Sequence, residues 1–287
     1  MHYSILRRCG GCPVSVLFVM AAVNVAGEVC SGAEPERQVT VAVVQFDAIP
    51  EFPAENLAAM TRLSRTAAGQ GARWVLFHEG SLCDYTDRLE QFAEEVPEGP
   101  STRAMIKVAQ ELNCVISFGL SEKAGVNFYI TQVFVGPSGL IHRYRKTWLY
   151  KDPADKGFRN EFARYDPGTG PELFLIDGIR ATCYVCADGT AARCIARAKS
   201  LRPEVVFYPV NVVAPDPKWV RDLAADNARA IGAPVLLSNR VGASWVHRDG
   251  NGGAAILSAS GDVLAAANVQ GREEIVIHRL TISTRGE

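Results

Sequence analysis

The sequence has no excess of charge of either sign. Its 287 residues include 30 Lys and Arg against 31 Asp and Glu, so the net charge is -1. A balanced chain lacks the basic surface that nucleic acids and anionic membranes attract. Charged residues make up 21% of the chain and hydrophobic residues 48%, which excludes a disordered or multi-spanning membrane protein. We therefore expect a globular protein with no nucleic-acid partner.

Cysteine is too sparse for a disulfide framework. Five of the eight cysteines follow residue 33, and an odd number in a long chain argues against a set of structural disulfides. These five are Cys83, Cys114, Cys183, Cys186 and Cys194. Cys183 and Cys186 form a Cys-x-x-Cys pair, but no second such pair and no paired histidines accompany it. A zinc site needs those further ligands, so we expect no metal.

Residues 1–33 are typical of a secretory signal peptide. Arg7-Arg8 precede the apolar run Pro13–Val23, and small residues follow. The run is short and flanked by glycines, so cleavage is favoured over a retained membrane anchor. This pattern predicts a periplasmic or secreted enzyme that comprises residues 34–287 and has no membrane contact after cleavage. A true start near Arg37 is the alternative, and it predicts a cytoplasmic protein.

Short apolar runs alternate with helical patterns along residues 34–287. The expected strands are Val39–Phe46, Trp74–Phe77, Cys114–Gly119, Phe128–Val135, Leu140–Tyr144, Glu172–Ile176, Ile179–Val185, Glu204–Tyr208, Val235–Ser238, Ala254–Leu257, Val263–Ala267 and Ile275–His278. The expected helices are Ala54–Ala68, Ser101–Leu112 with Ser101 as its cap, Ala191–Leu201 and Trp219–Ile231. Hairpins interrupt the strand–helix alternation, which favours one α/β domain with mixed sheets in layers. The stretch 146–170 has no periodic pattern, and loops of that length are usually functional or disordered.

Three chemically capable side chains follow expected strands, where α/β folds place their sites. Glu79 follows the strand at Trp74, and Lys146 closes a basic strand end. Cys186 lies between a strand and a helix that we expect to open near Thr190. The positive end of such a helix is expected to lower the thiol pKa. Taken singly, each residue has an ordinary alternative: a solvated acid, a solvated base or a structural thiol.

Taken together, these residues and their neighbours resemble the Glu-Lys-Cys triad of the nitrilase superfamily, the carbon–nitrogen hydrolases. The similar segments are Phe77-His78-Glu79 to Tyr85, Tyr144-Arg145-Lys146-Thr147-Trp148-Leu149, Glu161 before Pro167-Gly168, Cys186-Ala187-Asp188, Asn239-Arg240-Val241-Gly242, and Gly252-Gly253-Ala254 to Gly261-Asp262-Val263. The spacing to Pro209 selects Cys186 rather than Cys183 or Cys194 as the nucleophile. The resemblance implies the family's four-layer α-β-β-α sandwich.

The resemblance also implies a role for each residue of the site. Glu79 is the general base and then the general acid, and Cys186 is the nucleophile that forms a thioester. Lys146 and the backbone N–H of Ala187 stabilise the oxyanion. Glu161 positions Lys146 or the nitrogen of the substrate.

Tyr85 and Trp148 are expected to contact the substrate, a small molecule with an amide or N-carbamoyl group. Hydrolysis of its non-peptide C–N bond releases ammonia or an amine and requires no cofactor. The family also implies a homodimer or larger homo-oligomer.

One segment departs from the family pattern. Thr190-Ala191-Ala192-Arg193 stands where relatives often have Arg-Phe-Pro-Glu, which puts the substrate class in doubt. Cys-Ala-Asp is closer to the amidase and carbamoylase branches than to true nitrilases, which tend to have Cys-Trp-Glu. The alternatives on the same fold are a thiol acyltransferase, a nitrile hydrolase and a catalytically inactive binding protein.

Overall fold

A computed structural model of the protein describes residues 36–151, 160–213, 216–244, 249–268 and 271–283. The chain divides into units 1–33 and 34–287, and every described residue belongs to the second unit. The expected signal peptide therefore lies outside the described residues. In the ranges given above, no helix is both long enough and apolar enough to cross a membrane.

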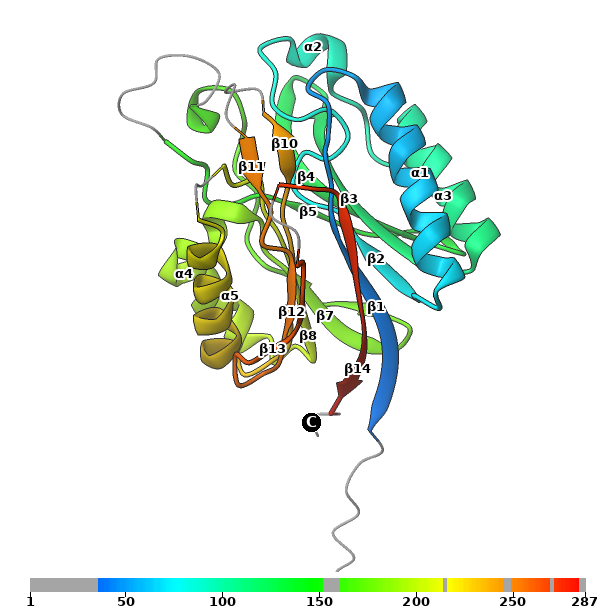
Figure 1. The fold of residues 1–287 in the computed structure, drawn as a ribbon. Helices are drawn as coiled ribbons and strands as arrows, with labels where there is room; N and C mark the ends of the chain where they lie inside the picture. The colour runs from blue at the N-terminus through cyan, green and yellow to red at the C-terminus, as the bar shows by residue number, and fades with distance from the viewer. Residues whose placement is uncertain (1–35, 152–159, 214–215, 245–248, 269–270, 284–287) are drawn as a thin grey trace, which may run out of the picture. The chain divides into compact units, whose positions relative to one another are not determined.

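The first sheet has six strands in the order β14-β1-β2-β3-β4-β5 (Figure 1). Its strands are β1 (Arg37–Gln45), β2 (Trp74–Leu76), β3 (Val115–Ala124), β4 (Asn127–Gly136), β5 (Gly139–Arg145) and β14 (Glu274–Ile282). The central strands β1, β2 and β3 are parallel, and the outer strands are antiparallel to their neighbours. Helices α1 (Pro53–Gly69) and α3 (Pro100–Leu112) cover one face of this sheet, and the short α2 (Leu89–Phe92) follows β2 along the chain.

The second sheet also has six strands, in the order β13-β12-β9-β8-β7-β6. Its strands are β6 (Phe174–Ile176), β7 (Ile179–Cys183), β8 (Val205–Pro209), β9 (Val235–Ser238), β12 (Ala255–Leu257) and β13 (Val263–Ala266). Strands β7, β8 and β9 are parallel. Helices α4 (Ala192–Ser200) and α5 (Lys218–Ile231) cover its outer face (Figure 1). A separate two-stranded ribbon consists of β10 (Val241–Ala243) and β11 (Asp249–Asn251).

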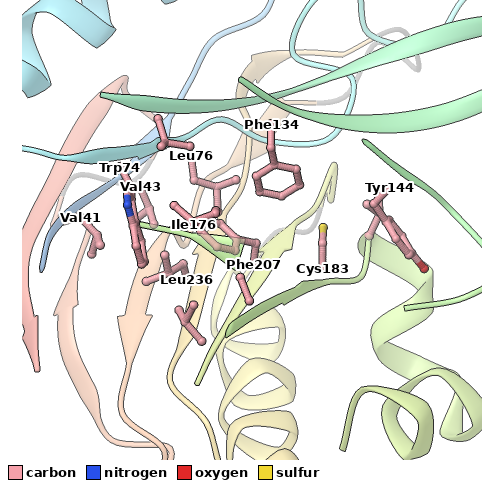
Figure 2. Close-up of a cluster of buried hydrophobic side chains, with 14 of the residues drawn as sticks. Val41, Val43, Trp74, Leu76, Phe134, Tyr144, Ile176, Cys183, Phe207 and Leu236 are labelled. Atoms are coloured by element: carbon pink, nitrogen blue, oxygen red, sulfur yellow. The ribbon is translucent and has the colours of Figure 1, made fainter. Parts of the chain in front are cut away.

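The two sheets pack face to face through a layer of buried apolar side chains. Figure 2 shows part of this layer, to which both sheets contribute. The ring centroids of Trp74 and Phe207 are 5.9 Å apart, and those of Phe134 and Phe174 are 4.8 Å apart. Each sheet also packs against its helices through one further apolar cluster. The predicted four-layer α-β-β-α sandwich with mixed sheets is therefore confirmed.

Several local features differ from the expectations. Strand β3 continues past Gly119 to Ala124, because its polar residue Glu122 is buried against two arginines of β5 rather than exposed in a turn. Gly99 rather than Ser101 caps α3, and the Ser101 hydroxyl instead donates to Glu94. The sequence also gave no indication of α2 or of the β10–β11 ribbon, which are too short to show a periodic pattern.

Candidate active site

The three expected triad residues each follow the end of a strand. Glu79 lies just beyond β2, Lys146 directly follows β5, and Cys186 follows β7. The first two strands belong to one sheet and β7 to the other. Glu161 lies in a short 3₁₀ turn, η1 (Glu161–Ala163), in the stretch that has no periodic pattern. The site is therefore assembled from both sheets.

The Lys146 ammonium lies between two carboxylates. Its Nζ is 2.8 Å from Oε1 of Glu79 and 2.8 Å from both oxygens of Glu161. All three side chains are almost completely buried. Burial alone would lower the pKa of Lys146, but the charges of Glu161 and Glu79 outweigh it and hold that pKa well above its ordinary value. Lys146 is therefore a permanently charged ammonium.

Burial raises the pKa of Glu161, against the opposing effect of Lys146. One of its oxygens also accepts a hydrogen bond from the Tyr85 hydroxyl at 2.9 Å, and the other accepts one from the Tyr150 N–H at 2.7 Å. These contacts fix the carboxylate in place. Tyr85, which we expected to contact substrate, is buried and in contact with Glu161.

Cys186 differs from the other described cysteines in its exposure and its backbone. All five are free, but Cys186 alone is half-buried, whereas Cys183 is completely buried in the layer between the sheets (Figure 2). The φ of Cys186, +46°, is in the left-handed region, which costs energy for a residue other than glycine. The Tyr208 hydroxyl donates to its carbonyl at 3.0 Å. Such strained residues cluster at functional sites.

The expected lowering of the Cys186 pKa was wrong. Burial, followed by the charge of Glu79, raises the pKa of this thiol, and Lys146 opposes the shift only in part. The expectation assumed a helix that opens beside the thiol, whereas the segment that begins at Cys186 is a five-residue 3₁₀ turn, η2 (Cys186–Thr190), and α4 begins only at Ala192. At neutral pH the sulfur is therefore a thiol that needs a base. The charges of Glu79, Lys146 and Glu161 all act on the pKa of this thiol, so the three groups lie near it.

The remaining expected contact residues lie beside this cluster. Ala187, the second residue of η2, is half-buried next to the thiol. Trp148 follows Lys146 by two residues and is 45% exposed. The Arg193 guanidinium stacks on its indole, with Cζ 4.7 Å from the ring centroid. The departure from the family pattern thus places a cation against an expected substrate-binding aromatic.

Asp188 is a buried residue whose importance the sequence did not show. Its carboxylate accepts hydrogen bonds from the main-chain N–H groups of Thr147, Trp148 and Val185 and from the Tyr144 hydroxyl, at 2.5–3.1 Å. It therefore joins the turn after Lys146 to the turn that contains Cys186. The motif Cys186-Ala187-Asp188 was visible in the sequence, but the partners of the carboxylate were not.

His78 is a second buried polar residue beside the site. Its Nδ1 is 2.7 Å from the Glu79 carbonyl oxygen, and since a carbonyl only accepts, Nδ1 carries the proton. Burial and then the positive charge of Arg240 lower the pKa of His78 to about 3. This histidine is therefore neutral in the folded protein.

Among the described residues, no group of three or more His, Cys, Asp and Glu side chains is arranged to hold a metal ion. The charges of the site belong to Glu79, Lys146 and Glu161. A buried ammonium between two carboxylates, next to a half-buried thiol, is suited to acyl transfer.

Comparison with known proteins identifies the class. The carbon–nitrogen hydrolase family model matches residues 40–287, so the chain belongs to the carbon–nitrogen hydrolase family. It is 30% identical to a nitrilase of Pyrococcus abyssi over 183 residues, which are 62% of this chain and 66%, just under two thirds, of that protein. It is 26% identical to an omega-amidase of Danio rerio over 83% of this chain and 86% of the relative.

A solved structure has the same fold. The amidase of Nesterenkonia sp. AN1, in a mutant form with acrylamide added at its active site cysteine, superposes with a TM-score of 0.75. The two chains are 18% identical, and the match covers 84% of this chain and 93% of the other. At that identity the likeness concerns the fold.

Proposed function

We propose that the protein is a thiol-dependent amidase that hydrolyses a small, non-peptide amide through a thioester on Cys186. The observation that supports it best is the position of Lys146, held at 2.8 Å from Glu79 and from Glu161 beside the Cys186 thiol. The relatives named amidases favour an amide over an N-carbamoyl compound as the substrate.

In this proposal Glu79 acts as the base. Its Oε1 accepts from Lys146, and its Oε2 is buried. Oε2 takes the proton of the Cys186 thiol, and the sulfur forms a bond to the carbonyl carbon of the amide. The Lys146 ammonium and the N–H of Ala187 stabilise the resulting oxyanion. The protonated Glu79 then gives its proton to the leaving nitrogen, the C–N bond breaks, and the thioester remains.

Water completes the reaction. Glu79 accepts a proton from a water molecule, whose oxygen attacks the thioester carbon. The C–S bond then breaks, the carboxylic acid leaves, and Glu79 returns its proton to the Cys186 sulfur, which re-forms the thiol. The raised pKa of Cys186 agrees with this order of events, because burial and Glu79 keep the sulfur protonated until the base acts. Glu79 therefore acts as a base and then as an acid in each half of the reaction.

Ammonia release from a panel of small amides, N-carbamoyl compounds and nitriles tests the proposal, with residues 34–287 as the enzyme. We expect release from amides by the wild type and by Cys183→Ser, and none by Cys186→Ala. Fluoroacetamide, whose acetamide moiety adds to the active site cysteine of a mutant form of the Nesterenkonia amidase, should add to Cys186 in an intact-mass experiment. Release from nitriles alone, or transfer of the acyl group to an added amine without hydrolysis, would point to the other chemistries of this triad. No turnover and no adduct would indicate a binding protein.

We also propose that the enzyme is exported and acts in the periplasm or outside the cell. The arginine pair and apolar run of residues 1–33 support export. The mechanism needs Cys186 as a free thiol, and the five described cysteines are all free. N-terminal sequencing of the protein from its own host, after fractionation, tests this. A cytosolic protein that starts at Met1 or near Arg37 would contradict export and leave the enzymatic proposal standing.

A homodimer or larger assembly is a further proposal, which rests on the family resemblance. Light scattering on the purified protein at several concentrations measures the mass directly. We expect at least twice the 31.1 kDa of the full chain, corrected for any cleaved segment. A single-chain mass at all concentrations would contradict it.

A further inference from the structure

A completely buried ion pair lies near the site, outside the groups used in the mechanism above. Arg240 follows β9, and its Nη1 is 2.5 Å from Oδ2 of Asp84; both side chains have 0% exposure. The other terminal nitrogen, Nη2, donates to the carbonyl oxygens of Ala48 and Ala243 at 3.2 and 2.7 Å. Removing two charges from water carries a desolvation penalty that their mutual attraction need not repay. Such a pair is therefore weak evidence of a stabilising role.

Asn211 links this ion pair to the second sheet. Its side-chain Nδ2 donates to Oδ1 of Asp84 at 2.7 Å, and Nη1 of Arg240 donates to its Oδ1 at 3.4 Å. Asn211 lies two residues beyond the end of β8. Each of the three side chains thus contacts the other two, and the side chain of Asn211 is fixed from both sides.

Asp84 belongs to the turn that carries Glu79. Its N–H donates to the Gly80 carbonyl at 2.7 Å, which closes the turn directly after the proposed base. A Cβ added at Gly80 would lie 3.5 Å from Nδ2 of Asn211. The turn of Glu79 on the first sheet therefore rests against Asn211 on the second.

The main-chain N–H of Asn211 lies near the proposed nucleophile. Burial is the main influence on the Cys186 pKa and raises it, whereas this N–H acts in the opposite direction. A donor to sulfur stabilises the thiolate more than the thiol. Asn211 thus contacts Asp84 through its side chain, and its backbone N–H influences the Cys186 sulfur.

We propose that Arg240 is a positioning residue, which through Asp84 and Asn211 holds the Glu79 turn and a main-chain donor at fixed places around the Cys186 sulfur. It acts through its neighbours and touches neither the substrate nor the reacting atoms. The effect on turnover rests on the proposed function, whereas the effect on the thiol does not. The base and the nucleophile come from different sheets, and this network links the turn after β2 to the segment after β8, which is the neighbour of β7 in the second sheet.

The test is the double variant Asp84→Asn, Arg240→Met, which removes both charges and so leaves no unpaired charge buried. The matched control is the double variant Arg37→Met, Glu204→Gln, which removes another ion pair with an N–O distance of 2.7 Å. The buried Glu204 directly precedes β8, whereas Asn211 follows the other end of that strand. Three quantities are measured: kcat and KM for the best amide, the rate of Cys186 alkylation by iodoacetamide between pH 6 and 10, and the melting temperature.

We expect kcat to fall about tenfold to a hundredfold in the double variant, the size of effect that a misplacement near 1 Å produces, while KM changes little. The alkylation profile should move to higher pH because the thiolate loses its donor. The control should keep both. Wild-type kcat and an unshifted alkylation profile in the folded double variant would overturn the proposal.

Two outcomes need a second measurement. If the double variant does not fold, Asn211→Ala carries the same test, since it removes only the side chain that joins Asp84 to this main chain; an unshifted alkylation profile there would overturn the proposal. If the wild type hydrolyses no amide, the proposed function fails, but the alkylation profile still decides whether Arg240 positions the donor at Cys186.

Discussion

A single methyl group at Gly119 should misplace the proposed base. Gly119 lies in β3, directly under the turn that carries Glu79, and it makes two hydrogen bonds to that turn. A Cβ at this position would be 2.2 Å from the Gly80 nitrogen and 2.9 Å from the Glu79 carbonyl carbon. These are backbone atoms, so no side-chain rotation relieves the overlap.

The size of the displacement follows from ordinary contact distances. Carbon–nitrogen contacts of 3.4–4 Å are normal for Cβ atoms, so in Gly119→Ala the turn must move by roughly 1 Å. A misplacement of that size costs about a hundredfold in rate, and overpacking costs about 1–3 kcal/mol of stability. We expect kcat to fall about a hundredfold while the thiol remains in place and continues to react with iodoacetamide.

Gly69→Ala is the matched control, because nothing lies within 4 Å of a Cβ there. Gly69 is the last residue of α1, so the change should leave kcat and the melting temperature close to those of the wild type. The measurements are kcat, the alkylation rate and thermal unfolding of the three proteins. If Gly119→Ala retains wild-type kcat, then either the turn does not rest on β3 or Glu79 is not the base.

Three further predictions concern the buried groups. Cys186→Ser should abolish turnover with little change in melting temperature. Cys183→Ser should keep turnover, but its free energy of unfolding in denaturant should fall by about 1–3 kcal/mol, since it buries a hydroxyl among apolar side chains. The reverse pattern would mean that the wrong cysteine is assigned. Lys146→Met should cost about 3–5 kcal/mol and abolish activity, because it leaves two carboxylates buried without their cation, and an unchanged unfolding free energy would contradict the ion pairs described. His78 has a folded-state pKa of about 3 against an ordinary 6.5, so only the unfolded chain takes up a proton as pH falls from 6.5 toward 3, and stability is lost over that range. In His78→Gln the drop in unfolding free energy between pH 7 and pH 5 should therefore be smaller by about 2 kcal/mol than in the wild type, and equal drops would show that His78 is not buried in its neutral form.

The sequence predicted the layers well because their patterns are local. The expected strand Val235–Ser238 has the bounds found for β9, and the helix expected at Trp219–Ile231 begins one residue earlier, as α5. Strand β3 was predicted too short because Ser121, Glu122 and Lys123 interrupt its apolar run. The partners of the Glu122 carboxylate lie on strands β4 and β5, 9 to 23 residues away, and no local pattern contains that information.

The site shows a similar division. Glu79, Lys146 and Cys186 were each visible at the end of an expected strand, and their resemblance to a family joined them into one hypothesis. The predicted direction of the Cys186 pKa shift was wrong, since the shift depends on burial and on charges that are distant in the sequence, first that of Glu79. Asp188 and Arg240 belong to segments that resemble the family, but their roles depend on partners that are distant in the sequence and that only the structure shows.

The origin of the site in two sheets has a consequence for how activity is acquired during folding. Glu79 and Lys146 follow strands of one sheet, whereas Cys186 follows a strand of the other. A chain in which either sheet has formed alone contains strands and helices but not the catalytic group. Recovery of thiol reactivity and turnover in a refolding experiment therefore reports the moment at which the faces of Figure 2 dock, a long-range event that follows local structure formation. Turnover and thiol reactivity can thus be used to follow the docking of the two sheets.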